Sequence, residues 1–379
     1  MIRHRVGDLR RRNHRTFVIA WLITSSVGCV RDAVPGDGSA VEFGPGIPEE
    51  RIAAATAYVD SIRAAHGIPG ISVATALGDR VVWQYAVGWS DSTRLERVSP
   101  SSLFRIGSVS KLLTAAAAVR LTDRGALDLD QPISAFIPMV PQTNVPITPR
   151  MLAGHLGGIR HYADGEYVSQ VAYPSVGASL SKFLDDPLVA TPGTRYAYSS
   201  YGYNLLGFVL EHATGKEFRT VVREEVTSPL GLEGIMPSEA GGLPYEVEYY
   251  SRTDSGELEE APFVDLSDRW PSGGYIASGG DLARFGSMVF GALSESARRT
   301  MLTPMETVEG TPTNVGVGWR IGVDSRGRRI AHHGGTAMGS RAFLLAYPEL
   351  GAAVAVLANL SFAPIGEAEA VRISELLGC

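Results

Sequence analysis

Lysine is almost missing from this chain of 379 residues. It occurs three times, at Lys111, Lys182 and Lys216, whereas arginine occurs 31 times. Arginine does not lose its proton in a protein, so it cannot serve as a base, whereas a buried lysine can. A lysine that such a chain keeps at the start of an apolar helix is therefore a candidate for proton-transfer chemistry.

Cysteine is as scarce, with only Cys29 and Cys379. This pair provides neither a disulfide framework nor a cysteine metal site. The eight histidines show no His-Glu-x-x-His spacing, and internal repeats and heptads are absent. We therefore expect a globular protein that is stabilised by its apolar core, without a metal or an organic cofactor.

The first 28 residues combine six arginines and one aspartate with an apolar stretch, TFVIAWLITSSVG, which ends before Cys29. A basic segment, a short apolar segment and small residues in this order are typical of a secretory signal. SVGC resembles a lipoprotein cleavage box, which makes Cys29 a candidate lipidation site; the alternative is cleavage nearby that leaves Cys29 free. We predict a signal peptide over residues 1–28, export across the inner membrane, and a periplasmic or lipid-anchored location.

Removal of residues 1–28 takes away six positive charges and one negative charge, so the net charge falls from −6 to −11. A chain this acidic is not expected to bind nucleic acid, and membrane contact is expected only through the lipid anchor. Residues 29–48 are rich in Gly and Pro and are predicted to form a flexible tether. The folded domain is predicted to span residues 49–379, a length that suits one large domain.

Strand patterns gather near both ends of the chain. Residues 71–91 alternate around a Gly-Asp turn, and residues 315–360 contain several strand-like runs. The middle third is predicted to be helical, apart from residues 163–190 and 234–272, which are expected to wall a cleft. The sequence thus predicts an α/β (α+β) fold, in which one antiparallel sheet from both chain ends is flanked by helices and an all-helical lobe.

Ser108 and Lys111 lie in the segment FRIGSVSKLLTAAAAVR, residues 104–120. Residues three apart share one face of a helix, so a Ser hydroxyl and a Lys amine can meet at the helix N-terminus. The unpaired N–H groups there favour a developing negative charge, and desolvation lowers the lysine pKa towards a neutral amine that can accept the serine proton. The alternative is a surface lysine beside a helix-capping serine.

The same Ser-x-x-Lys spacing recurs at Ser179 and Lys182. There, an Asp-Asp-Pro sequence ends the element within one turn, whereas the run after Ser108 is long and apolar enough to be buried. We therefore favour Ser108 and Lys111 as the reactive pair.

Two further stretches contain residues suited to chemistry. Tyr198 precedes Ser199 and Ser200 in an aromatic loop, and a phenol near a positive amine can relay a proton; the alternative is that these tyrosines are packing residues. HHGG, residues 332–335, lies between strand-like runs. Glycines there let main chain approach a ligand, and an N–H group can face an oxyanion.

Together these stretches resemble the serine β-lactamase and penicillin-binding-protein superfamily, in the class C-like branch that includes S12 peptidases and family VIII esterases. That superfamily has Ser-x-x-Lys, then Tyr-x-Asn, then Lys- or His-x-Gly. The matching segments here are Ser108-Val-Ser-Lys111, Tyr198-Ser-Ser200 and His332-His-Gly334. The surrounding HLGGI and PGTRYAYSSYGYNLLG are similar too.

The resemblance implies a β-lactamase/transpeptidase-like fold and specific roles. Ser108 is the implied nucleophile, and Lys111 and Tyr198 share its proton, with the choice of base left open. The N–H groups of Ser108 and Gly335 are implied to form the oxyanion hole.

Gly334, His332 and Ser200 complete the implied substrate-binding set, with two departures from the superfamily pattern. Ser200 stands where β-lactamases have an Asn whose amide contacts the substrate and the lysine. His332 stands where they have a Lys that attracts the β-lactam carboxylate, and a histidine is mostly uncharged at neutral pH. Both departures argue against an efficient β-lactamase.

We therefore predict a serine hydrolase that forms an acyl-enzyme and hydrolyses an ester or a peptide-like amide. It would act as a carboxylesterase, a D-amino-acid peptidase or a carboxypeptidase, on small molecules or on cell-wall peptide. One alternative is a non-catalytic or slowly acylating penicillin-binding sensor, which the retained Lys111 opposes. The other is a true class C-like β-lactamase.

Overall fold

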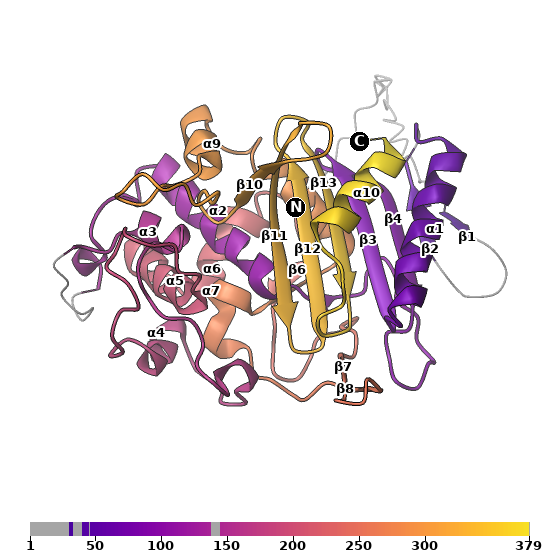
Figure 1. Cartoon of the computed structure of the whole chain (residues 1–379), viewed down its shortest axis with the longest axis horizontal. Coiled ribbons are helices and arrows are strands. Elements are labelled where there is room, and N and C mark those ends of the chain that lie inside the picture. Colours follow the sequence, from indigo (N-terminus) through magenta and orange to yellow (C-terminus); the bar gives the residue numbers. More distant parts are fainter. Residues whose placement is uncertain (1–29, 33–39, 45, 138–144, 379) are drawn as a thin grey trace, which may run out of the picture.

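An eight-stranded antiparallel sheet forms the centre of the protein (Figure 1). It belongs to a computed structural model that describes residues 30–32, 40–44, 46–137 and 145–378. The strands lie in the order β1-β2-β4-β3-β13-β12-β11-β10. In that order they are Val30–Asp32, Ala40–Phe43, Arg80–Gly88, Gly70–Leu77, Ala352–Ala358, Ser340–Tyr347, Arg329–Ala337 and Arg320–Val323.

Strands from the two ends of the chain meet in the middle of this sheet. β3 pairs with β13, so that Ile71 lies opposite Ala358 and Leu77 lies opposite Ala352. Every residue of β13, AAVAVLA, is buried. This strand is covered on both faces, and such strands have continuous apolar runs rather than alternating ones. The predicted antiparallel sheet from both chain ends is confirmed.

Helices cover both faces of the sheet. α1 (Glu49–Ala65) and α10 (Glu367–Leu377) pack together on one face, and α8 (Gly279–Met288) packs on the other (Figure 1). Two apolar clusters result: Val59 and Ile373 belong to the first, while Leu282 and Phe285 belong to the second. Burial of this apolar area is the main contribution to the stability of the fold.

A helical lobe stands beside the sheet (Figure 1). Its longest members are α2 (Ser110–Asp123) and α5 (Ser200–Thr214), and α2 is buried along almost its whole length. The shorter members are α3 (Pro149–Ala153), α4 (Val176–Ser179), α6 (Phe218–Val222), α7 (Trp270–Gly273) and α9 (Glu295–Leu302). Two small sheets are also present, formed by β5 (Phe104–Arg105), β9 (Tyr275–Ala277) and β6 (Ile235–Pro237), and by β7 (Tyr250–Arg252) and β8 (Leu258–Glu260).

Two segments differ from the sequence-based expectation. The predicted tether, residues 29–48, contains β1 and β2, and β2 pairs with residues 83–86 of β4. The predicted loop region, residues 234–272, contains β6, β7, β8 and most of α7. These elements have only three or four residues each, which is too short for periodicity to be recognised in a sequence rich in Gly and Pro.

The predicted signal peptide and Cys29 lie outside the described residues. Within the described part of the chain, no helix combines the length and the apolar character needed to cross a membrane.

Candidate active site

Ser108 lies in the tight turn Gly107–Val109 that leads into α2. The turn is possible because Gly107 adopts a positive φ of 50°, a conformation that glycine tolerates best. A Cβ atom on Gly107 would lie 2.6 Å from the carbonyl oxygen of Thr336. This glycine therefore lets the start of α2 approach strand β11 closely.

Lys111 is fully buried one turn after Ser108. Its Nζ atom donates hydrogen bonds to Ser108 Oγ at 3.2 Å, to Ser200 Oγ at 3.0 Å and to the Ser272 carbonyl oxygen at 2.7 Å. Burial lowers the pKa of Lys111 to about 7, with a further lowering from the positive charge of Arg269. A substantial fraction of the amine is therefore neutral near pH 7.

Tyr198 contacts the same serine from the loop before α5. Its hydroxyl donates to Ser108 Oγ at 2.8 Å, and Lys111 Nζ lies 5.0 Å from the ring centroid. Burial raises the pKa of Tyr198 above its ordinary value of 10. The phenol is therefore protonated at neutral pH, whereas the lysine amine is partly free to accept a proton.

His155, His161 and His333 surround this group, and the sequence analysis had given none of these three a role in the site. His155 Nδ1 accepts from the Ser199 N–H at 3.1 Å, and His161 Nδ1 accepts from the Ser200 N–H at 3.2 Å. Burial, followed by the positive charge of Lys111, lowers the pKa of His161 to about 4 and that of His333 to about 3. These rings are neutral at pH 7 and leave Lys111 as the titrating group.

Strand β11 presents His333, rather than the predicted His332, to Tyr198. The rings of His333 and Tyr198 are 6.4 Å apart, whereas His332 stacks on Phe343 at 5.5 Å and contacts Glu367 at 3.3 Å. Successive side chains of a strand point to opposite faces of the sheet. A shift of one residue in the motif is therefore enough to exchange the two histidines.

The same alternation decides in which direction the N–H groups of Gly335 and Thr336 point. The N–H of Ile321 in β10 donates to the Asn314 carbonyl outside the sheet and so points away from β11. The neighbouring residue, Arg320, therefore makes the hydrogen bonds to β11, where its partner is His332. Alternate residues of an antiparallel strand direct their N–H groups to the same side. The Thr336 N–H therefore faces the open edge beyond β10, and that of Gly335, the predicted donor, faces β12.

Packing supports this assignment. A Cβ atom on Gly335 would lie 1.9 Å from the Ile106 carbonyl oxygen, so this glycine is needed for the close contact between β11 and the turn before α2. Thr336 passes directly beside Gly107. The main chain next to Ser108 thus belongs to Thr336.

A cavity of about 630 Å³ connects these groups. Its wall includes residues of all three motifs, namely Ser108, Tyr198, Ser200, His332, His333, Gly334 and Thr336. The predicted cleft segments also contribute, residues 163–190 through Tyr167 and residues 234–272 through Val264, Leu266 and Arg269. A second cavity of about 700 Å³ lies beside α6 and β6, but it contains none of the groups around Ser108.

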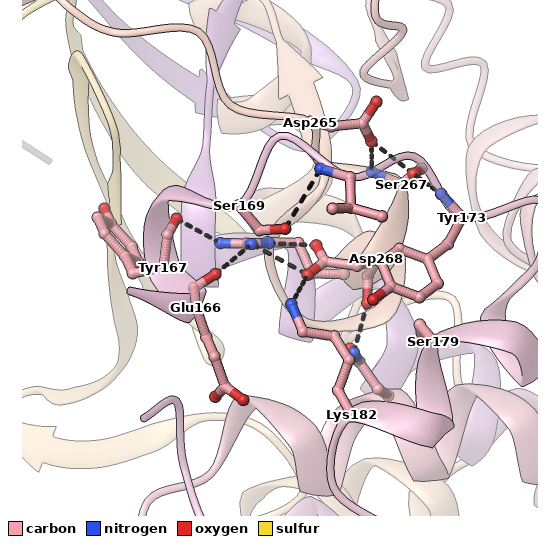
Figure 2. A network of polar contacts seen from close by, with 12 residues as sticks. Glu166, Tyr167, Ser169, Tyr173, Ser179, Lys182, Asp265, Ser267 and Asp268 are labelled. Atoms are coloured by element: carbon pink, nitrogen blue, oxygen red, sulfur yellow. Dashed lines mark hydrogen bonds and ion pairs between the residues drawn. The ribbon is translucent and has the colours of Figure 1, made fainter. Parts of the chain in front are cut away.

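The second Ser-x-x-Lys copy has separate partners. Ser179 Oγ donates to the Val176 carbonyl at 2.8 Å, and Lys182 Nζ donates to Asp268 Oδ2 at 2.6 Å. Figure 2 shows Lys182 directed at Asp268. Within the described residues, no group of three or more His, Cys, Asp or Glu side chains is arranged to hold a metal ion.

Comparisons with known proteins agree with the resemblance seen in the motifs. Serine beta-lactamase-like protein LACTB, mitochondrial, from Homo sapiens is 24% identical over 380 aligned positions, covering 75% of this chain and 69% of the relative. D-alanyl-D-alanine-carboxypeptidase/endopeptidase AmpH from Escherichia coli K12 is 25% identical over 291 positions, covering 72% and 74%. A crystal structure of a D-stereospecific amidohydrolase from Streptomyces sp. matches with a TM-score of 0.72 at 23% identity, covering 86% of this chain and 99% of that one. The family model described as Beta-lactamase matches residues 55–377, and the chain therefore belongs to the beta-lactamase family.

Proposed function

We propose that the protein is a serine hydrolase that forms an acyl-enzyme at Ser108 and then transfers the acyl group to water. The observation that carries this proposal is the position of Ser108 Oγ, which lies within hydrogen-bond distance of both Lys111 Nζ and Tyr198 OH. Covalent catalysis requires a nucleophile that is hydrogen-bonded to a group able to accept its proton.

Neutral Lys111 is the base in this proposal. Two of its N–H bonds point to the Ser272 carbonyl and Ser200 Oγ, so the nitrogen lone pair of the deprotonated amine faces Ser108. Lys111 takes the hydroxyl proton as Ser108 Oγ attacks the carbonyl carbon. The oxyanion that forms accepts hydrogen bonds from the N–H groups of Ser108 and Thr336.

Tyr198 is placed to protonate the leaving group. As the carbon–oxygen or carbon–nitrogen bond of the substrate breaks, the phenol gives its proton to the departing atom, and the Lys111 ammonium returns a proton towards Tyr198. Water then attacks the acyl carbon, and Lys111 or Tyr198 takes a proton from the water. The bond between the acyl carbon and Ser108 Oγ breaks, and the same residue returns the proton to Ser108 Oγ. The carboxylic acid is released without a metal or a redox step.

Trapping of the acyl-enzyme tests this proposal. We expect the chain from residue 30 onward, mixed with p-nitrophenyl acetate and quenched in acid, to carry one acetyl group on the peptide that contains Ser108. Peptide mass spectrometry detects the adduct, and a sample denatured beforehand serves as the control. Release of p-nitrophenol with the acetyl group on another residue would contradict the assignment of Ser108.

The charges of the cavity favour a substrate that carries a carboxylate. The lining residues include Arg269, Arg320 and Arg341 but no Asp or Glu, although the chain as a whole is acidic. Arg341 Nη1 donates to Thr336 Oγ1 at 2.5 Å, and its Nε donates to the Ile365 carbonyl at 3.2 Å. It has no carboxylate partner among the described residues.

The sequence analysis noted that β11 has a histidine where β-lactamases have a positively charged lysine. Arg341 supplies a positive charge from the neighbouring strand β12 instead. Arg341 is hydrogen-bonded to Thr336, the proposed oxyanion donor on β11. An arginine in this position can hold a substrate carboxylate close to the scissile bond. Within the predicted range of esterase, D-amino-acid peptidase and carboxypeptidase activities, this arrangement favours the carboxypeptidase type. The proposal is supported by AmpH, whose name describes a carboxypeptidase.

Substitution of Arg341 tests the anionic substrate. We expect Arg341→Gln to lower kcat/KM for the benzoylglycyl thioester of mercaptoacetate by roughly ten- to a hundredfold, as for the loss of a hydrogen bond to a charged group. The thioester of mercaptoacetamide, which differs only in charge, should change by less than about threefold. Arg341→Lys keeps the charge and should lie between. Equal losses on both thioesters would contradict a role in carboxylate binding.

We also propose export of this chain across the inner membrane, with a periplasmic or lipid-anchored location. The support is the order of basic, apolar and small residues before Cys29. Labelling with a radioactive fatty acid would distinguish the lipidated form from simple cleavage, because Cys29→Ser abolishes the label only in the first case.

A further inference from the structure

A buried group of charges lies beside the cavity but outside the chemistry described above. The Asp268 carboxylate is completely buried and lies between two cations, Lys182 at 2.6 Å and Arg269 at 2.5 Å (Figure 2). Lys182 and Arg269 are themselves nearly buried. Because lysine is so rare in this chain, its use at a buried ion pair that carries no proposed chemistry requires an explanation.

This group connects three parts of the helical lobe. The Arg269 guanidinium donates to the Tyr167 and Glu166 carbonyls, both at 3.0 Å, which fastens the cleft segment 163–190. The Asp268 carbonyl accepts from Asn204 of α5 at 2.6 Å. Figure 2 shows Glu166, Tyr167 and Lys182 around Asp268, a residue that lies just before α7 in the chain.

α7 in turn holds the proposed base. The Ser272 carbonyl accepts from Lys111 Nζ at 2.7 Å, and the neighbouring Pro271 carbonyl accepts from Thr114 Oγ1 at 2.6 Å. Both acceptors are main-chain atoms of a four-residue helix, WPSG. So short an element does not fix its own position, and its position depends on the residues on either side.

We propose that Lys182, Asp268 and Arg269 are positioning residues, which fix α7 so that the Ser272 carbonyl holds Lys111 against Ser108. This inference rests on the proposed function of Ser108. It explains why the second Ser-x-x-Lys copy contains a lysine: Lys182 is used as a buried cation on Asp268, and Ser179 has no part in it.

The test separates the rate at each active site from the number of active sites. A fluorophosphonate probe titrates reactive Ser108, and the burst of p-nitrophenol from p-nitrophenyl acetate gives the acylation rate. We expect Lys182→Met to lower the acylation rate per titrated site roughly ten- to a hundredfold, because small misplacement of a catalytic group has effects of that size. KM should change by less than about twofold, since Lys182 does not line the cavity.

Three matched variants complete the experiment. Lys182→Arg keeps the cation and should restore most of the rate, while Ser179→Ala should behave as the wild type. Thr114→Val removes the second anchor of α7 without a change in charge. It should also lower the rate per site with KM unchanged, and this variant remains informative if Lys182→Met does not fold.

Different results would overturn different statements. A wild-type rate per titrated site in both Lys182→Met and Thr114→Val would overturn the positioning role, even if fewer sites were titrated, because a purely structural effect changes only the folded fraction. Probe labelling and ester hydrolysis that persist in Ser108→Ala would overturn the proposed function and this inference with it.

Discussion

Ser108→Ala is expected to lower kcat/KM for p-nitrophenyl acetate by roughly a thousandfold or more. The ester should then hydrolyse no faster than it does in buffer without enzyme, although the variant is folded. The reason is that Ser108 Oγ lies within hydrogen-bond distance of both Lys111 and Tyr198 and is only partly buried. Ser200 also contacts Lys111 and Tyr198, but it begins α5 and is almost completely buried. The substitution removes one oxygen atom at a partly exposed site, so the fold should be retained.

The matched control for this prediction is Ser179→Ala. It removes the serine of the other Ser-x-x-Lys segment, whose hydroxyl bonds to the Val176 carbonyl at 2.8 Å, and should keep full activity. Circular dichroism and the thermal midpoint check that both variants are folded. Full activity in Ser108→Ala would exclude the mechanism. Equal loss in both variants would point to a shared folding defect instead.

Lys111→Met is expected to lower kcat/KM between about a hundredfold and ten thousandfold, the range for removal of a general base. Methionine has a similar length and fits a completely buried site without a charge. The variant therefore removes the proton acceptor while Ser108, Tyr198 and the cavity remain. Lys216→Met, at an exposed lysine bonded to Glu224, is the matched control and should have no effect.

The pH dependence of kcat/KM tests whether Lys111 must be neutral for activity. Because burial lowers the pKa of Lys111 to about 7, the amine is protonated below that pH and cannot accept the serine proton. Wild-type kcat/KM should therefore fall as the pH decreases below about 7 and level off above it. This acid limb should be absent from the residual activity of Lys111→Met. A limb of unchanged position in the variant would assign the titration to another group.

The local part of the candidate site could be predicted from the sequence. Ser108 and Lys111 are three residues apart in one apolar segment, so helix geometry alone brings them together. The predicted family and the antiparallel sheet from both chain ends are confirmed. Tyr198 lies 90 residues away along the chain, and only the order of motifs in the resembling superfamily suggested its place.

The roles of the two histidines in the motif depend on strand register. His332 and His333 are adjacent, and both fit a His-x-Gly pattern: the first with Gly334, the second with Gly335. Which of them faces Tyr198 depends on the pairing of β11 with β10 and β12. A sequence pattern without the partner strands does not fix that choice, and the proposed oxyanion donor shifts with it from Gly335 to Thr336.

The network around Asp268 was also beyond the reach of the sequence. Its members come from residues 166–182 and 265–269, two segments without helical or strand periodicity. Burial of Lys182 depends on a carboxylate that lies 86 residues further along the chain. Loops of this kind take their positions from tertiary contacts, so local propensity carries little information about them.

The pairing of β3 with β13 has a consequence for how this protein is made. The Gly70 N–H donates to Asn359 Oδ1 at 2.7 Å across 289 residues of chain, and the centre of the sheet has similar separations. During synthesis, β3 therefore presents an unpaired edge until nearly all of the chain has left the ribosome. The native sheet closes late, by slow non-local association, and until then the exposed edge of β3 is open to pairing with other chains.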